Sequence, residues 1–404
     1  MANKDVLRKI KSLAHSYREE IISIRRHIHS HPELSFQEKE TAAFISKKLS
    51  EWGIAHQTNI GGFGIVGLIK SNVNQSSEVN RVIALRADMD ALPITEQNQV
   101  EYKSQNTGVM HACGHDVHSS ALLGALKILN ECRNDFTGTI KFILQPAEEK
   151  LPGGAKQMIE AGVLESPKPD LIIGQHVFTQ LKVGTAGFRS GIYMASADEI
   201  YISVKGKGGH AAEPNNVINP IFIAAKLLTE LEKLSDELSH SSVPTVLNFG
   251  KIVGAGATNV IPDEVTIDGT LRTMDETWRF QMHDRLRKLV KDFSSAEKKE
   301  LLLRIEVGYP CLVNDDAVTS SSRKFAEEFL GNENVKELDM RMASEDFAFY
   351  SQKIPACFYR IGTGNPEKGI VSGIHTPTFN IDEDALEFAS GMMAFLAVKH
   401  LSSL

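Results

Sequence analysis

Residues 82–86 read VIALR, a short run of apolar and β-branched side chains that predicts a buried strand. A helical pattern over 119–132 follows, and a second apolar run over 139–144 comes after it. Strands that alternate with helices in this way predict a largely parallel sheet covered by helices on both faces, an α/β fold. The same alternation continues in strand-like runs at 65–69 and 171–173 and in helical patterns at 13–28, 37–52 and 154–161.

The pattern changes near residue 198, where a compact βαββαβ order begins. Its elements are expected at 200–204, 219–234, 245–252, 265–270, 276–293 and 302–307. We therefore expect an inserted α+β domain at 190–308 and a discontinuous first domain made of 1–189 and 309–404. Helices expected near 317–330, 344–351 and 384–401 return the chain to this first domain.

Charge and composition narrow the classes of partner. A formal net charge of -7 and the absence of a basic stripe argue against nucleic acid and anionic membranes. Residues 1–10 lack the apolar segment of a signal peptide, and no stretch approaches the roughly 20 apolar residues that span a bilayer. Four scattered cysteines fit a reducing compartment, so the sequence predicts a cytoplasmic protein.

Four short segments carry side chains that bind divalent metals. They contain Asp88 and Asp90 after the first strand, Cys113 and His115 before the helix at 119–132, Glu148 and Glu149 after the strand at 139–144, and His176 after the strand at 171–173. Because the carboxyl ends of parallel strands share one edge of a sheet, we expect these segments to converge there.

The ligand types favour zinc or another first-row divalent ion, because they combine a thiolate, imidazoles and carboxylates. Each segment by itself has a simpler explanation. Cys113 and His115 would also suit one structural zinc or a buried thiol, and Glu148 and Glu149 would suit a solvated charge pair. His176 alone is typical of a core histidine, and His375 of a loop. Their expected convergence favours a metal site.

Five spaced motifs resemble one family: DMDALP at 88–93, HACGHD at 111–116, QPAEE at 145–149, GKGGHAA at 206–212 and SEDF at 344–347. The chain resembles the co-catalytic metallopeptidases that include aminoacylases and glutamate carboxypeptidases. Within them it is most similar to hippurate hydrolases, bacterial N-acyl-amino-acid amidohydrolases and plant auxin-conjugate hydrolases. The match extends from Arg25 to the loop of His375.

The resemblance implies that two divalent metal ions, zinc or manganese, are held by Cys113, His115, Glu149, His176 and His375. It makes Glu148 the general base that handles the proton of a metal-activated water. Asp88 and Asp90 are expected behind the ligands, where they orient them.

In the inserted domain the resemblance implies that His210 polarises the scissile carbonyl across a homodimer interface. It also implies that Asn259 and Arg272 bind the substrate, and an arginine fork suits a carboxylate. The inserted domain would then be a lid and dimerisation domain. Taken without the resemblance, His210 is a surface histidine in a glycine-rich turn, and Arg272 is a surface charge.

The expected reaction is hydrolysis of the amide bond of an N-acyl amino acid, which releases a carboxylic acid and a free amino acid. One alternative is a metal-independent hydrolase in which Cys113 is a nucleophile activated by His115 or His111. Another is a non-catalytic metal- or ligand-binding module, against which the acid pair at 148–149 argues. For Ser344-Glu345-Asp346 we expect a helix N-cap with acids in the first turn.

Overall fold

Strand β3 (Val82–Asp88) is buried at every residue and lies between two parallel neighbours, β4 and β5. A strand covered on both faces needs apolar side chains on both, which explains the unbroken run at its start. In the described part of the chain, eight strands form this sheet. Their order is β1 (His56–Ile60), β2 (Gly64–Lys70), β4 (Thr139–Gln145), β3, β5 (Leu171–Lys182), β16 (Ala356–Gly364), β6 (Ala186–Phe188) and β15 (Val335–Glu337).

A computed structural model describes residues 2–73 and 81–403, which form two compact units. Unit 1 runs from the N-terminal helix to Gly191, then over Val313–Asp339 and from Asp346 onward. Unit 2 consists of Ile192–Leu312 and Met340–Glu345. The sequence pattern assigns Met340–Glu345 to the first domain, but these residues pack with the second unit.

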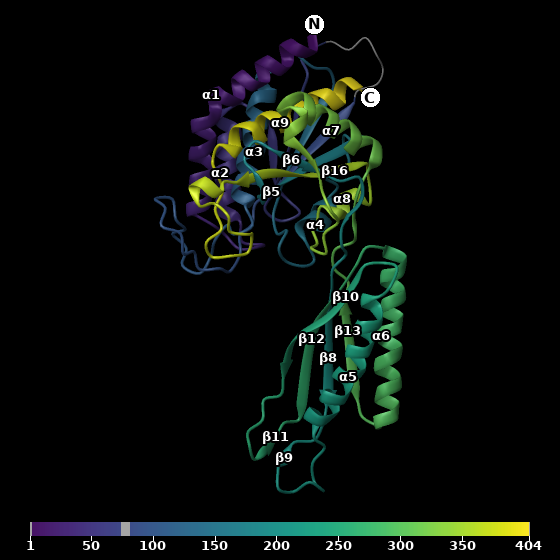
Figure 1. Ribbon diagram of the computed structural model, residues 1–404. Helices are drawn as coiled ribbons and strands as arrows, with labels where there is room; N and C mark the ends of the chain where they lie inside the picture. The colour runs from purple at the N-terminus through teal and green to yellow at the C-terminus, as the bar shows by residue number, and fades with distance from the viewer. Residues whose placement is uncertain (1, 74–80, 404) are drawn as a thin grey trace. The chain divides into compact units, whose positions relative to one another are not determined.

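Helices cover both faces of the large sheet in unit 1 (Figure 1). One face carries α1 (Ala2–Ser30), α3 (His115–Glu131), α7 (Asp316–Leu330) and α9 (Ala385–Ser403), and α2 (Lys39–Glu51) packs near β1 and β2. The other carries α4 (Gly154–Glu160) and α8 (Ala348–Ser351). Helix α9 is apolar around most of its circumference because it is buried between its neighbours.

Unit 2 has its own sheet and its own apolar core. Strand β8 (Asp198–Lys205) alternates buried and more exposed residues, as expected for a sheet covered on one face. Among the described residues of unit 2, the four main strands have the order β10 (Thr245–Val253), β12 (Glu264–Thr273), β8 and β13 (Leu301–Glu306). Its helices are α5 (Pro220–Ser239) and α6 (Glu276–Glu297), and a two-stranded ribbon joins β9 (Gly209–His210) to β11 (Val260–Ile261).

The remaining elements are short. Strands β7 (Gly191–Met194) and β14 (Leu312–Asn314) lie where the chain passes between the units, and η1 (Asn332–Asn334) and η2 (Pro366–Lys368) are 3-10 turns. None of the helices in the described ranges is both long and apolar enough to span a membrane.

Three of the differences between predicted and observed boundaries lie near the predicted site segments. Helix α3 begins at His115, not near Ser119, so the HACGHD motif leads directly into its first turn. Strand β5 continues to Lys182 because β16, which the sequence analysis did not assign, pairs with most of its length. Helix α8 begins only at Ala348, so the predicted N-cap at 344–346 is wrong.

Candidate metal centre and active site

The predicted metal-binding segments meet at the carboxyl edge of the large sheet. Asp88 at the end of β3 pairs with Gln145 at the end of β4, and the next residues of that loop are Pro146, Ala147 and then the two glutamates. Arg86 lies opposite Gly174 of β5, which places His176, two residues farther along, at the level of Asp88. The N-terminus of α3 presents Cys113 and His115 to the same edge.

Glycine is required just before α3. Gly114 caps the helix with φ of 88°, a left-handed conformation that glycine adopts without a steric penalty. A Cβ atom at this position would lie 2.5 Å from Cγ2 of Val177 on β5. The absence of a side chain therefore lets the turn between Cys113 and His115 approach the strand that carries His176.

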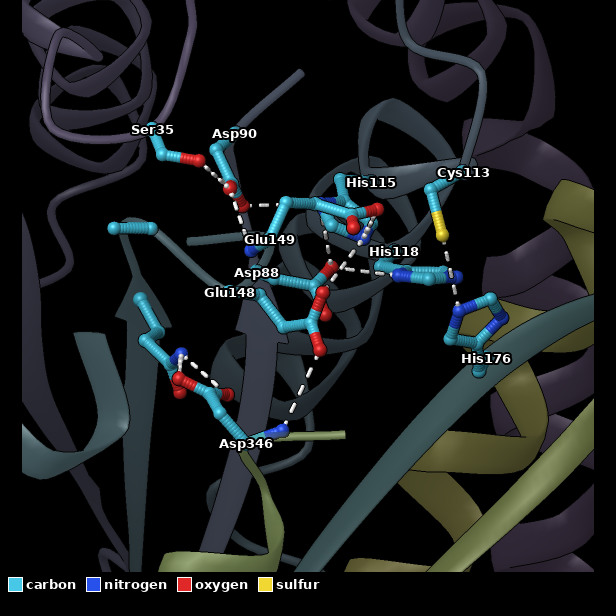
Figure 2. A network of polar contacts seen from close by, with 12 residues as sticks. Ser35, Asp88, Asp90, Cys113, His115, His118, Glu148, Glu149, His176 and Asp346 are labelled. Atoms are coloured by element: carbon cyan, nitrogen blue, oxygen red, sulfur yellow. Dashed lines mark hydrogen bonds and ion pairs between the residues drawn. The ribbon is translucent and has the colours of Figure 1, made fainter. Parts of the chain in front are cut away.

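The five predicted ligands lie together in groups that overlap, and Figure 2 shows four of them: Cys113, His115, Glu149 and His176. Ligand atoms lie within 4.8 Å of one another in three groups: Cys113, His115 and His176; Cys113, Glu149 and His375; and His115, Glu148 and Glu149. Sγ of Cys113 is 3.4 Å from Nε2 of His176, and Nε2 of His375 is 3.1 Å from Oε1 of Glu149. Overlapping groups of this kind suit two neighbouring cations.

The central atoms are spaced to hold a cation. Nε2 of His115 is buried and forms no hydrogen bond within the described residues. Its nearest carboxylate oxygens, on Glu148 and Glu149, are each 3.9 Å away. Zinc binds nitrogen and oxygen ligands at about 2.0–2.2 Å, so an ion fits between these atoms.

The local charge also favours a bound cation. Burial and the carboxylates of Glu149, Glu148 and Asp88 raise the pKa of the Cys113 thiol well above its usual range. A nucleophilic cysteine needs the opposite shift, which argues against Cys113 as a metal-independent nucleophile. A divalent ion stabilises the thiolate, and the donor set of sulfur, imidazole and carboxylate fits zinc or a similar ion.

Asp90 holds two of the candidate ligands in place. Its Oδ1 is 3.1 Å from Nδ1 of His115, so Nε2 of that ring faces the cluster. Its Oδ2 accepts the backbone N–H of Glu149 at 3.0 Å and the hydroxyl of Ser35 at 2.7 Å. Burial lowers the pKa of His115, but Asp88, Asp90 and Glu149 raise it, to a net value of about 10. The aspartates thus favour a strongly basic imidazole.

His118 is a polar partner to which the sequence analysis gave no role. Its Nδ1 donates to Oδ1 of Asp88 at 2.6 Å, and its Nε2 accepts the N–H of Val177 at 2.9 Å. The ring therefore bridges Asp88 to β5, beside His176, with ring centroids 4.5 Å apart. The spacing of three residues from His115 on one helix was the available signal.

A second hydrogen-bond network, which the sequence did not predict, contacts Glu148 through the backbone of Asp346. Arg86 donates to Asp88, Gln145 and Asp346, and Gln145 also donates to Asp346. The backbone N–H of Asp346 is 3.4 Å from Oε1 of Glu148. Asp346 is thus a buried acceptor in unit 1 and not the helix cap that the sequence suggested, because burial among Arg86, Gln145 and the N–H of Ala155 determines its role.

The three candidate residues of unit 2 lie near opposite ends of that unit. His210 and Asn259 are exposed on the β9–β11 ribbon, where the N–H of Ala211 donates to the carbonyl of Asn259 at 3.0 Å. Arg272 is half-buried near the end of β12 and donates to the Ser344 hydroxyl at 2.9 Å. The eight residue steps from Glu264 to Arg272 alone correspond to about 26 Å of strand.

Comparison with known proteins agrees with this geometry. The model of peptidase family M20/M25/M40 matches residues 84–399. The N-acyl-L-amino acid amidohydrolase of Geobacillus stearothermophilus is 40% identical over 308 residues, which are 76% of this chain and 81% of the relative. The N-acetyl-L-cysteine deacetylase of Bacillus subtilis is 38% identical over 384 residues, 95% of this chain and 89% of the relative.

A solved structure extends the likeness to the whole fold. The YXEP protein of Bacillus subtilis, described as a dinuclear metal-binding peptidase of family M20, superposes with a TM-score of 0.81 at 33% identity. The match covers 96% of this chain and 99% of that one. Together with the cluster at the sheet edge, these likenesses show that the chain is a metal-dependent amidohydrolase and belongs to peptidase family M20/M25/M40.

Proposed function

We propose that this enzyme hydrolyses the amide bond of N-acyl amino acids and that Glu148 is its general base. The observation that carries the proposal is the position of two adjacent carboxylates in one cluster: Glu149 lies beside His375, and Glu148 lies beside His115. The names of the Geobacillus and Bacillus relatives support N-acyl amino acids as the substrate class.

Two divalent ions bound by Cys113, His115, Glu149, His176 and His375 would supply positive charge that acidifies a water molecule and polarises the acyl carbonyl. Glu148 takes a proton from the attacking water. It then delivers this proton to the nitrogen of the departing amino acid as the C–N bond breaks. The products are a carboxylic acid and a free amino acid, so all atoms of the water are accounted for.

Glu148→Gln tests the base directly. The amide cannot accept the proton, so we expect kcat to fall by at least about 100-fold. Elemental analysis should find the same metal content as in the unchanged enzyme, because Glu149 and the other ligands remain. A Glu148→Gln enzyme with full activity would remove Glu148 from this role.

Removal of metal tests the reaction class. Dialysis against a strong chelator should abolish hydrolysis, and addition of Mn²⁺ or Zn²⁺ should restore it. The ion that restores more activity indicates the preferred metal. Activity that survives complete metal removal would favour the cysteine mechanism instead. A panel in which the acyl group and the amino acid vary separately then defines the substrate.

We further propose that the enzyme is a homodimer in which His210 serves the active site of the partner. Nδ1 of His210 accepts the N–H of Ala212 at 3.1 Å, which leaves Nε2–H to donate to the oxyanion. Arg272 and Asn259 are the candidate partners of the substrate carboxylate. Because His210 and Arg272 lie near opposite ends of unit 2, a second chain is a reasonable source of His210.

The surface of unit 2 supports a paired state. Within the described strands, β10 is an edge strand, and it exposes Ile252 and Val253 at 52% and 44%. Phe222 at the start of α5 is 69% exposed. Unprotected apolar edges of this kind favour association with another copy.

The four buried cysteines without disulfides support a cytoplasmic location.

Complementation distinguishes the two possible sources of His210. A mixed dimer of His210→Ala and Glu148→Gln chains has one active site with Glu148 intact and His210 supplied by the partner. If His210 acts across the dimer, mixing equal amounts of the two inactive proteins with random subunit exchange restores up to about a quarter of the activity, because half of the dimers are then mixed and each of these has one competent site. If His210 acts within its own chain, mixing restores none. Sizing in solution checks the dimer independently.

A further inference from the structure

One buried carboxyl group near the catalytic loop has no part in the chemistry described so far. Glu38 lies just before α2 and is 0% exposed. Its Oε1 accepts the backbone N–H of Ala147 at 2.7 Å and that of Phe36 at 3.0 Å. Its Oε2 is buried and has no hydrogen-bond partner within residues 2–73 and 81–403. A buried carboxyl group is unfavourable unless its contacts serve the fold or the site.

Both amides that Glu38 binds belong to residues in unusual conformations. Phe36 has φ of 67° and Ala147 has φ of 54°, in the left-handed region that residues other than glycine rarely adopt. Such a backbone persists only when surrounding contacts hold it, and it is frequent at functional sites. Ala147 lies between the end of β4 and the two glutamates.

Several backbone contacts hold this turn. The carbonyl of Ala147 accepts the N–H of Gly154 at 2.8 Å. A Cβ atom on Gly154 would lie 1.7 Å from the carbonyl oxygen of Pro146, so the two segments meet as closely as a backbone allows. The N–H of Glu149 donates to Asp90 (Figure 2). Glu38 adds a contact to the N–H of Ala147.

We propose that Glu38 is a positioning residue that holds the turn at Ala147 and thereby aims Glu148 and Glu149 at the metal cluster. This inference rests on the function proposed above for those two glutamates. Glu38 acts through the loop and does not touch substrate or metal.

The role requires an oxygen acceptor and not a negative charge. Burial, together with the charge of Asp90, raises the pKa of Glu38 to about 7. A protonated carboxyl group still offers a carbonyl oxygen to the two amides. Glutamine offers the same oxygen, whereas alanine offers none.

Glu33 provides a matched control on the same segment. Its carboxylate also accepts backbone N–H groups, those of Glu40 at 3.1 Å and Thr41 at 2.8 Å, at the start of α2. Glu33→Ala therefore removes bonds of the same kind without removing any bond to the catalytic loop.

The experiment compares Glu38→Ala, Glu38→Gln and Glu33→Ala with the unchanged enzyme. We expect Glu38→Ala to lower kcat by about 10- to 100-fold with KM nearly unchanged, the range for loss of a partner behind the ligands. Glu38→Gln should restore most of kcat. Glu33→Ala should lower the melting temperature but leave kcat unchanged. If Glu38→Ala does not fold, Glu38→Asp takes its place, because the shorter side chain withdraws the oxygen from Ala147.

A second readout does not depend on hydrolysis. Titration of metal-free protein with Mn²⁺ should show weaker binding in Glu38→Ala than in Glu38→Gln or Glu33→Ala, because Glu149 is a ligand on the same loop. A Glu38→Ala enzyme that matches Glu33→Ala in kcat and in Mn²⁺ affinity would overturn the proposal, as would a Glu38→Gln enzyme as impaired as Glu38→Ala. If the unchanged enzyme cleaves no N-acyl amino acid, the proposed function fails, and the Mn²⁺ titration still decides the role of Glu38.

Discussion

The metal cluster of unit 1 and the β9–β11 ribbon of unit 2 hold their polar side chains in opposite ways. His115 is completely buried and oriented by Asp90, which is itself bonded to Ser35 and Glu149. His210 is exposed, and its ring accepts one hydrogen bond, from an amide two residues away. A site whose side chains are all held by hydrogen bonds from neighbouring residues is preorganised by the fold itself. A histidine with so few contacts gains a defined position only when another surface packs against it.

The largest expected effect comes from the buried side of this comparison. Cys113→Ala removes the ligand common to the groups that contain His176 and His375. Loss of a cation removes several kcal/mol of transition-state stabilisation, so we expect activity to fall by more than about 1,000-fold. Elemental analysis should find fewer than two ions per chain. An alanine variant that retains both ions would show that the cluster does not depend on the thiolate.

A smaller effect is expected at the exposed ribbon. If His210 donates to the oxyanion as proposed, His210→Ala should lower kcat by about 100-fold, while the metal content stays the same. His240→Ala, at an exposed histidine that ends α5, is the matched control and should leave kcat unchanged. Equal activity of the two variants would mean that the ribbon histidine has no catalytic part.

The smallest expected effect is on stability. It tests whether polar side chains elsewhere in unit 2 have as few contacts as those of its ribbon. Asp198 is buried and accepts hydrogen bonds from Arg279 Nε at 2.9 Å, His283 Nε2 at 2.6 Å and Gly308 N at 3.0 Å. Burial raises the pKa of Asp198, but the bonds from Arg279 and His283 outweigh it and lower the pKa to about 2.

Because the pKa of Asp198 is lower in the folded state than in the unfolded state, the free energy of unfolding must fall as the pH falls. The ionised Asp198 stabilises the fold fully above about pH 4, the usual pKa of an aspartate, and this contribution of roughly 2 kcal/mol disappears as the pH falls to about 2. Urea unfolding at pH 4.5 and 2.5 should show this loss, and Asp198→Asn should show less of it. If Asp198→Asn and the unchanged protein lose the same stability between pH 4.5 and 2.5, the ion pairs of Asp198 with Arg279 and His283 do not contribute to the acid sensitivity.

Local sequence patterns were sufficient to predict most of the fold. Buried strands such as β3 have continuous apolar runs and amphipathic helices such as α5 have a helical period, and neither pattern depends on distant contacts. Strand β16 was missed, although it lies inside the sheet, because its short run of apolar residues was not assigned to an element. The length of β5 depends on pairing with β16, which the local sequence does not encode.

The candidate ligands were predictable because they occur in spaced motifs, and the sheet topology brings the ends of the strands together. Of the residues that support them, Asp88 and Asp90 were predicted, but others were not. Asp346 looks like a helix cap in sequence, yet in the fold it is a buried acceptor for Arg86 and Gln145. Glu38 is one of many acids in a polar segment, and only the approach of the Ala147 turn gives it a distinct role.

The glycine that caps α3 has a consequence for redesign of this enzyme. Position 114 tolerates neither a side chain, because Val177 occupies the space, nor an ordinary backbone conformation, because φ is 88°. Directed-evolution libraries aimed at new acyl groups should therefore leave this codon unchanged. Diversity introduced at exposed positions such as Val371, which is 63% exposed in the loop that leads to His375, costs far less folding stability.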